Sequence, residues 1–186
     1  MAKKPLNIHL GCGERNIPGF TNVDLGKFSH IHYRHSIDNL PMFKSGSADL
    51  IYSSHAFEYF DRLEAEKVLK EWGRILKRGG VLRLAVPDFE AMLVVYKKYK
   101  ELKKILGPLF GRWSVVGSKK IIYHKTVYDF KDLKELLGKN GFRDVKRYNW
   151  RKTIHKGFDD HSQAYVPHMD KDNGLLISLN VEAKKK

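Results

Sequence analysis

The feature that most constrains the fold is a short alternating strand that runs directly into a glycine turn. Leu6 to Leu10 alternates between apolar and polar residues, and Gly11-Cys12-Gly13 follows at once. Glycines at a strand end adopt positive φ at little cost and let a ligand approach the backbone. No Gly-Lys-Ser/Thr follows, and Asn16 stands where a dinucleotide fingerprint has its third glycine. The pattern therefore predicts a ligand-binding turn that is neither a P-loop nor a dinucleotide fingerprint.

Strand and helix patterns alternate along the rest of the chain. Strands are predicted at 20–24, 48–52, 81–86, 142–150 and 175–182, and helices at 61–78, 88–106 and 129–139. Asp61 and Glu64 form a capping-box pattern, Gly79-Gly80 ends the first helix, and Gly107-Pro108 closes the second. In that second helix we expect Phe89, Met92, Leu93, Tyr96 and Tyr99 to face inward. This order predicts a largely parallel sheet, with ligands bound beyond the carboxyl ends of its strands.

Length and composition favour one folded domain that spans residues 1–186. The chain is 42% hydrophobic, and no apolar run approaches the roughly 18–20 residues that span a bilayer. The single cysteine, Cys12, excludes an internal disulfide and a multi-cysteine zinc site. The first residues do not resemble a secretory signal. We therefore expect a cytoplasmic protein.

The net charge of +14 is concentrated in a few places. Lys97 to Lys125 holds nine basic residues and one acid, Glu101. Five lysines at the chain ends, which we expect to be solvated, supply most of the remainder: Lys3, Lys4, Lys184, Lys185 and Lys186. This distribution weakens the case for nucleic acid and makes the basic segment a candidate docking surface for an anionic acceptor.

Two acids follow predicted strands. Asp24 ends the second strand, and its carboxylate could accept both hydroxyls of a ribose. Asp38 follows a predicted third strand and is suited to an adenine amino group.

Three stretches then match one family in order: the segment from Asn7 to Leu25, the segment from Ala48 to Phe60, and Glu-Trp-Gly-Arg-Ile-Leu-Lys-Arg-Gly-Gly before the strand that ends at Pro87-Asp88. Together they resemble the class I S-adenosylmethionine-dependent methyltransferases, in particular small members associated with polysaccharide assembly. The resemblance implies a Rossmann-like α/β fold: a mostly parallel seven-stranded sheet with an antiparallel late strand and helices on both faces. Two departures are His9, where the family usually has an acid, and residues 14–23, which are too few for the usual helix.

The resemblance also implies the cofactor S-adenosylmethionine, the product S-adenosylhomocysteine, and no metal. By position in the motifs, the cofactor-binding residues would be Leu10, Gly11, Cys12, Gly13, Asp24, Leu25, Asp38, Ser53, Ser54 and His55.

The residues after the fourth predicted strand bear on the chemical class of the acceptor. Methyltransferases that act on planar amino groups carry Asn/Asp-Pro-Pro-Tyr/Phe after the fourth strand, whereas this chain reads Ser-Ser-His-Ala-Phe. A hydroxyl acceptor needs a base. His124 is the first candidate, with His55, Asp88 and His161 as the others.

Residues 151–174 are long for a loop and combine aromatics, acids and histidines, which suits a sugar-binding active-site loop. A metal site built from Asp159, Asp160, His161 and His168 is the alternative for this segment.

Three functions therefore remain open. The first is O-methylation of a sugar or glycan hydroxyl, for example on a deoxysugar such as rhamnose. The second is an RNA methyltransferase that uses residues 97–125 to bind phosphates. The third is a non-catalytic module that binds S-adenosylmethionine.

Overall fold

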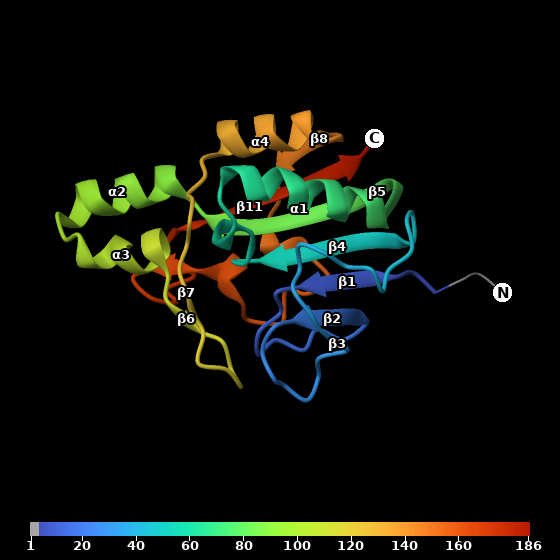
Figure 1. Cartoon of the computed structure of the whole chain (residues 1–186). Coiled ribbons are helices and arrows are strands. Elements are labelled where there is room, and N and C mark those ends of the chain that lie inside the picture. Colours follow the sequence, from blue (N-terminus) through green and yellow to red (C-terminus); the bar gives the residue numbers. More distant parts are fainter. Residues whose placement is uncertain (1–3) are drawn as a thin grey trace.

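The computed structural model describes residues 4–186, so Lys3 lies outside the described residues. One seven-stranded sheet has the order β3-β2-β1-β4-β5-β11-β8 (Figure 1). Its strands are β1 (Asn7–Leu10), β2 (Phe20–Asp24), β3 (Tyr33–Arg34), β4 (Ala48–Ser54), β5 (Leu76–Pro87), β8 (Phe142–Arg147) and β11 (Ser178–Lys185). β11 is antiparallel to both β5 and β8, whereas β3, β2, β1, β4 and β5 pair in parallel. The predicted α/β fold with one antiparallel late strand is confirmed.

The first helix, α1 (Arg62–Ile75), begins at the predicted cap. The Asp61 side chain accepts from the backbone of Leu63 and Glu64, and the Glu64 side chain accepts from the Asp61 backbone. The helix ends earlier than the glycine pair indicated. Leu76 is extended and already pairs with Ala48 in the sheet, because its buried side chain belongs to the core. The segment 76–80 is therefore strand, not helix.

The single helix predicted over 88–106 is wrong. The chain forms two helices, α2 (Phe89–Tyr99) and α3 (Lys103–Phe110), separated by Lys100 in the left-handed region at φ 55°. Gly107 and Pro108 lie inside α3 and do not close the preceding helix.

The inward face predicted for this region also needs correction. Met92 is buried, but Phe89, Leu93 and Tyr96 are exposed. The reason is that α2 packs through a narrow face, and the α2–α3 pair projects beyond the carboxyl ends of β1 and β4 (Figure 1).

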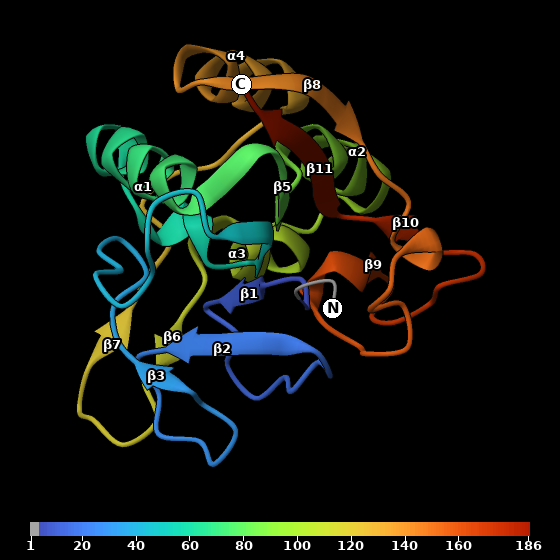
Figure 2. The same cartoon turned by 90° about the vertical axis from the view of Figure 1, so that its right-hand side faces the viewer.

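The two faces of the sheet are covered in different ways (Figure 2). α1 and α4 (Phe130–Lys139) pack on one face and build the main core with residues such as Leu10, Ile51 and Val86. On the other face, Ile17 and Phe20 pack with Leu50 and Tyr52, and Phe158 joins them from the late segment. That segment contains the 3₁₀ helices η2 (Trp150–Lys152) and η3 (His161–Gln163) and the small pair β9 (Tyr165–Val166) and β10 (Leu175–Leu176). Only residues 11–19 lie between β1 and β2, so the late segment supplies the cover that a helix would otherwise provide.

Three smaller elements complete the description: the 3₁₀ helix η1 (Phe57–Tyr59) and the hairpin of β6 (Trp113–Ser114) with β7 (Ile121–Ile122). Of the C-terminal lysines, Lys184 and Lys186 are exposed, as expected, and Lys185 is half-buried. Lys184 and Lys185 belong to β11, and Lys185 Nζ donates to the Leu76 carbonyl at 2.7 Å. Within residues 4–186, no helix has the length and apolar character needed to cross a membrane.

Candidate active site

The glycine turn and Asp24 meet because β1 and β2 are parallel neighbours. Gly13 N donates to Asp24 Oδ2 at 2.9 Å, and Gly26 N donates to Oδ1 at 2.6 Å. A carboxylate has about four acceptor sites, so two backbone bonds leave Asp24 capacity for ribose hydroxyls. Gly11 has φ 66°, and a Cβ there would overlap the Cβ of Ala56, which explains why this position needs glycine.

Polar groups without partners line the same edge of the sheet. Ser53 Oγ and Ser54 Oγ, at the carboxyl end of β4, are buried and have no hydrogen-bond partner among the described residues. Unsatisfied buried hydroxyls beside an open glycine turn fit a polar ligand. Cys12 is buried, and burial raises the pKa of its thiol to about 12, so it is not a nucleophile at neutral pH.

Two of the other predicted cofactor residues are at the surface, whereas Leu10 is fully buried. Leu25 directly follows Asp24 and is 36% exposed, and Asp38 is exposed four residues after β3. No contact among the described residues shows how the Asp38 side chain lies relative to the glycine turn. Its role at an adenine therefore stays a prediction.

The β6–β7 hairpin crosses this region. The Trp113 ring lies 3.9 Å from the position that a Gly13 Cβ would take, and Lys27 N donates to the Val116 carbonyl at 3.0 Å. The hairpin is thereby fastened to the segment that follows β2. Trp113 is the aromatic side chain that faces the glycine turn.

Three of the four candidate bases gather near one buried acid, Glu58. The distance from Glu58 Oε1 is 3.4 Å to His55 Nδ1 and 3.6 Å to His124 Nε2. The His161 ring meets the His55 ring edge-on at a centroid distance of 5.2 Å. Glu58 is fully buried, and neither carboxylate oxygen has a hydrogen-bond partner in the described part of the chain. His55 has φ 50°, a strained conformation that is frequent at functional sites.

A chain of hydrogen bonds fixes the His55 tautomer. Asn180 Nδ2 donates to the Ser162 carbonyl at 2.8 Å, so Asn180 Oδ1 is the oxygen that accepts from Ser178 Oγ at 3.1 Å. Ser178 Oγ then accepts from His55 Nε2, also at 3.1 Å. The unprotonated nitrogen of a neutral His55 is therefore Nδ1, which faces Glu58.

The second histidine is arranged in the same way. His124 Nδ1 donates to the Pro108 carbonyl at 3.0 Å, which leaves Nε2 as the basic nitrogen facing Glu58. Gly111 makes room for this ring, because a Cβ there would overlap His124 Nε2.

Burial sets the protonation of the cluster. It raises the pKa of Glu58 to about 8 and lowers the pKa of His55 well below its usual range, with the nearby His161 and His124 adding to the second shift. Burial also lowers the pKa of His124 and of His161. These shifts favour a protonated Glu58 carboxyl and neutral imidazoles at neutral pH, with the lone pairs of His55 and His124 facing the carboxyl.

His161 is the exposed member of the cluster, and the residues on either side of it hold it in place. Tyr52 Oη donates to Asp160 Oδ2 at 2.5 Å, and the Ser162 carbonyl accepts from Asn180. These bonds anchor the late segment to the sheet at the position of His161.

The fourth candidate base, Asp88, lies apart from this cluster. Its carboxylate caps α2 through Ala91 N at 3.3 Å and pairs with Arg147 at 2.9 Å. Its contacts are those of a helix cap in an ion pair.

Glu58 is the residue that sequence reasoning missed. The available signal was an acid inside the apolar run Ala-Phe-Glu-Tyr-Phe, three residues after His55 and hence on the same side of a helical turn.

The acids and histidines of the late segment do not converge on a common point. Asp159 pairs with Lys171, whereas Asp160 is bonded to Tyr52 and to Ser162 N. Among residues 4–186, no group of three or more His, Cys, Asp or Glu side chains is arranged to hold a metal ion.

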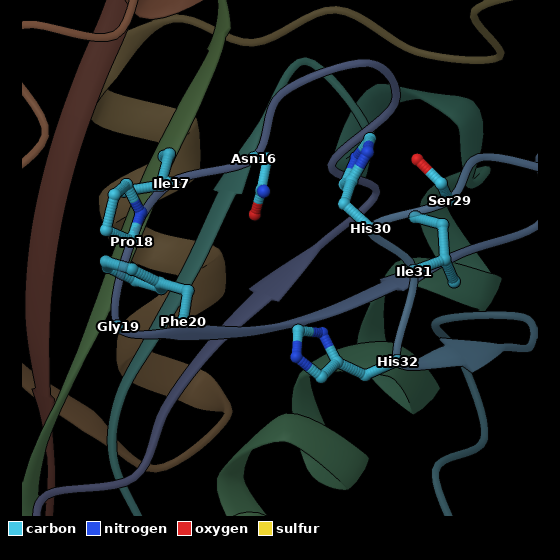
Figure 3. Close-up of a pocket in the computed structure, with 9 residues that line it drawn as sticks. All are labelled: Asn16, Ile17, Pro18, Gly19, Phe20, Ser29, His30, Ile31 and His32. Atoms are coloured by element: carbon cyan, nitrogen blue, oxygen red, sulfur yellow. The ribbon is translucent and has the colours of Figure 1, made fainter.

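A separate hollow of about 350 Å³ lies between residues 16–20 and 29–32 (Figure 3). Its walls include Asn16, His30 and His32 but none of the predicted cofactor residues. His30 Nε2 lies 3.0 Å from the Gly13 carbonyl, so the hollow adjoins the glycine turn without being part of the site.

Comparison with known proteins agrees with this geometry. Residues 21–84, a part of the chain, match the family described as methyltransferase domain. Together with the strand order, the glycine turn and Asp24, this match supports an S-adenosylmethionine-dependent methyltransferase of class I. The cofactor prediction is confirmed at the level of this class.

Solved structures agree on the fold. A methyltransferase from Thermotoga maritima, described as a possible histamine N-methyltransferase, superposes with a TM-score of 0.61 at 19% identity, covering 99% of this chain and 84% of that one. An S-adenosylmethionine-dependent methyltransferase from Listeria monocytogenes gives 0.57 at 16% identity over 98% and 90%. The 1,6-didemethyltoxoflavin N1-methyltransferase of Burkholderia thailandensis, solved with S-adenosylhomocysteine, gives 0.56 at 11% identity over 98% and 72%. Among curated proteins, none matches the sequence.

Proposed function

We propose that this methyltransferase methylates a hydroxyl group of a sugar or glycan. The observation that carries the proposal is the cluster of neutral histidines around Glu58 at the carboxyl end of β4. Transfer to a hydroxyl must remove a proton from the acceptor, and a neutral imidazole is suited to take it near neutral pH. The Ser-Ser-His-Ala-Phe sequence in place of the amino-transfer motif points in the same direction.

His161 is assigned as the group that touches the acceptor, because its side chain is exposed whereas those of His55 and His124 are nearly buried. When bound, S-adenosylmethionine supplies the electrophilic methyl group on its sulfonium. His161 would accept the proton that the acceptor hydroxyl loses when it is methylated. The Gly11–Gly13 turn and Asp24 would hold the cofactor, and Trp113 would cover it, which would help to orient it for in-line transfer.

The test is a transfer assay with labelled S-adenosylmethionine over glycosides, nucleotide sugars and RNA. We expect a sugar hydroxyl to be methylated, and His161→Asn to lower kcat by about 10²–10⁴-fold while calorimetric binding of the cofactor is unchanged. His124→Asn is expected to have a smaller effect, because the His124 side chain is nearly buried and does not reach the acceptor. Asp24→Ala should abolish cofactor binding.

Methylation of RNA with no sugar substrate would overturn the proposed acceptor. An active His161→Asn enzyme combined with an inactive His124→Asn enzyme would return the base role to His124.

A further inference from the structure

Exposed apolar side chains gather in one part of the molecule. Among residues 4–186, fifteen large hydrophobic residues are exposed, and ten of them lie between Phe89 and Tyr123, a stretch that includes α2, α3 and the β6–β7 hairpin. Single exposed hydrophobics are ordinary, whereas a concentration of them marks an interaction surface.

The pattern is regular on α3. Leu102, Leu106 and Phe110 follow one another at four-residue spacing and are 54%, 40% and 55% exposed. No residue of α3 is fully buried. On α2, Phe89, Leu93 and Tyr96 form a second exposed stripe at helical spacing. Both helices therefore present apolar stripes to solvent.

Lysines accompany these stripes. The stretch from Phe89 to Tyr123 holds eight basic residues and two acids. One of the acids, Glu90, is paired with Arg147, and the other, Glu101, lies near Lys103 and Lys104. Lys97, Lys98 and Lys100 are exposed at the end of α2, next to the turn into α3. A helix pair that combines exposed apolar stripes with an excess of lysine has the composition of an interfacial membrane anchor.

The position of the pair connects this surface to the candidate site. α2 and α3 lie at the carboxyl edge of the sheet (Figure 1), and the carbonyls of Pro108 and Phe110 accept from His124 Nδ1 and N. A surface that α3 contacts would thus be close to the histidine cluster.

We infer that the α2–α3 hairpin docks on the surface of a lipid bilayer that contains anionic lipids. Leu102, Leu106 and Phe110 enter the headgroup–acyl boundary, and the lysines contact anionic headgroups. RNA explains the lysines but not the leucine stripe, because single-stranded RNA is held by stacking on aromatic rings. A second copy of the chain would bring two basic surfaces together, which like-charge repulsion opposes.

The experiment is co-sedimentation of the full chain with vesicles, in the absence of S-adenosylmethionine and any acceptor. One vesicle preparation is phosphatidylcholine alone, and the other mixes it equally with phosphatidylglycerol. We expect binding to the mixed vesicles that weakens as salt is added. Because no methyl transfer is measured, failure here and failure of the proposed function are distinguishable.

Two sets of variants test the assignment. The triple variant Leu102→Gln, Leu106→Gln and Phe110→Gln should weaken vesicle binding by at least about tenfold. The pair Lys97→Gln and Lys98→Gln should weaken it by about 25-fold, because each lysine near an anionic surface contributes about fivefold. The matched controls are Leu63→Gln with Ile154→Gln, two exposed apolar residues elsewhere, and Lys131→Gln with Lys134→Gln on α4. These controls should bind like the unmodified chain.

Three outcomes would overturn the inference. The first is no binding to the mixed vesicles. The second is binding that the hairpin variants leave unchanged. The third is a dimer in analytical ultracentrifugation that the triple variant converts to a monomer, which would show that a second copy covers this face.

Discussion

Glu58 is a buried acid whose titration should change the stability of the protein with pH. Its pKa of about 8 in the folded protein lies above the ordinary value of 4.5, so the folded state binds the proton more tightly. Stability from this group is fully present below pH 4.5 and is lost as the pH rises toward 8. We expect Glu58→Gln, which cannot titrate, to gain in Tm relative to the unmodified protein as the pH is raised over this range. Parallel Tm curves for the two proteins would contradict the assigned pKa.

Tyr52 and Tyr128 are two buried tyrosines, of which one forms a hydrogen bond through its hydroxyl and the other forms none within residues 4–186. Tyr52 donates to Asp160, whereas Tyr128 Oη has no partner among the residues described. Tyr52→Phe removes a bond that anchors the late segment and should cost about 1–3 kcal/mol of unfolding free energy. Tyr128→Phe should be neutral or slightly stabilising. Urea unfolding of both variants checks this, and equal losses would show that the Tyr52–Asp160 bond is not the anchor.

The residues of the histidine cluster could be nominated from the sequence but not grouped. His55 was found because it follows a recognisable strand, and His124 and His161 because histidines suit proton transfer. Their convergence on Glu58 depends on where the segment that follows β7 and the late segment cross the sheet edge. Neither crossing has a local sequence signal, so grouping these residues required the structure.

At the scale of elements, helix starts were predicted correctly from the sequence where a capping residue and the hydrophobic periodicity agreed. The α1 cap and the start of α4 at Asp129 were predicted because a side-chain acceptor and an apolar stripe coincide there. The break between α2 and α3 was missed because the lysine-rich run from Lys97 to Lys104 is a good helix former. The stripe of Phe89, Leu93 and Tyr96 was taken for a buried face, but helical spacing alone does not reveal whether a face is covered.

The contact of the β6–β7 hairpin with the glycine turn leads to a testable prediction. Because the Trp113 ring lies over the glycine turn, Trp113→Ala should weaken binding of S-adenosylmethionine by about tenfold. Tyr123→Ala, an exposed aromatic directly after the same hairpin, is the matched control and should leave affinity unchanged. Calorimetric titration measures both, and equal affinities for the two variants would remove the hairpin from the cofactor site.

For the whole molecule, buried neutral histidines predict loss of stability in acid. Burial lowers the pKa of His9 to about 3 and lowers that of His155. Both rings stack against Tyr52, His9 from β1 and His155 from the late segment. The unfolded chain takes up these protons near pH 6.5, whereas the folded protein resists them. Tm should therefore fall steadily as the pH is lowered from 6.5 toward 3. In His155→Phe, which keeps the ring contact without a titratable nitrogen, this fall should be shallower, and an unchanged slope would count against the assignment.

The place of β11 between β5 and β8 has a consequence for biosynthesis. Leu179 pairs with Val86 of β5, and Val181 pairs with Arg147 of β8. The edges of β5 and β8 are therefore both unpaired until β11 is in place. Until residues 178–185 have emerged from the ribosome, β5 has an open apolar edge that invites pairing with other chains. Contacts between positions so distant in sequence also form slowly. The parallel half of the sheet can assemble earlier, but the fold closes only once residues 178–185 are available, and the open edge of β5 favours aggregation until then.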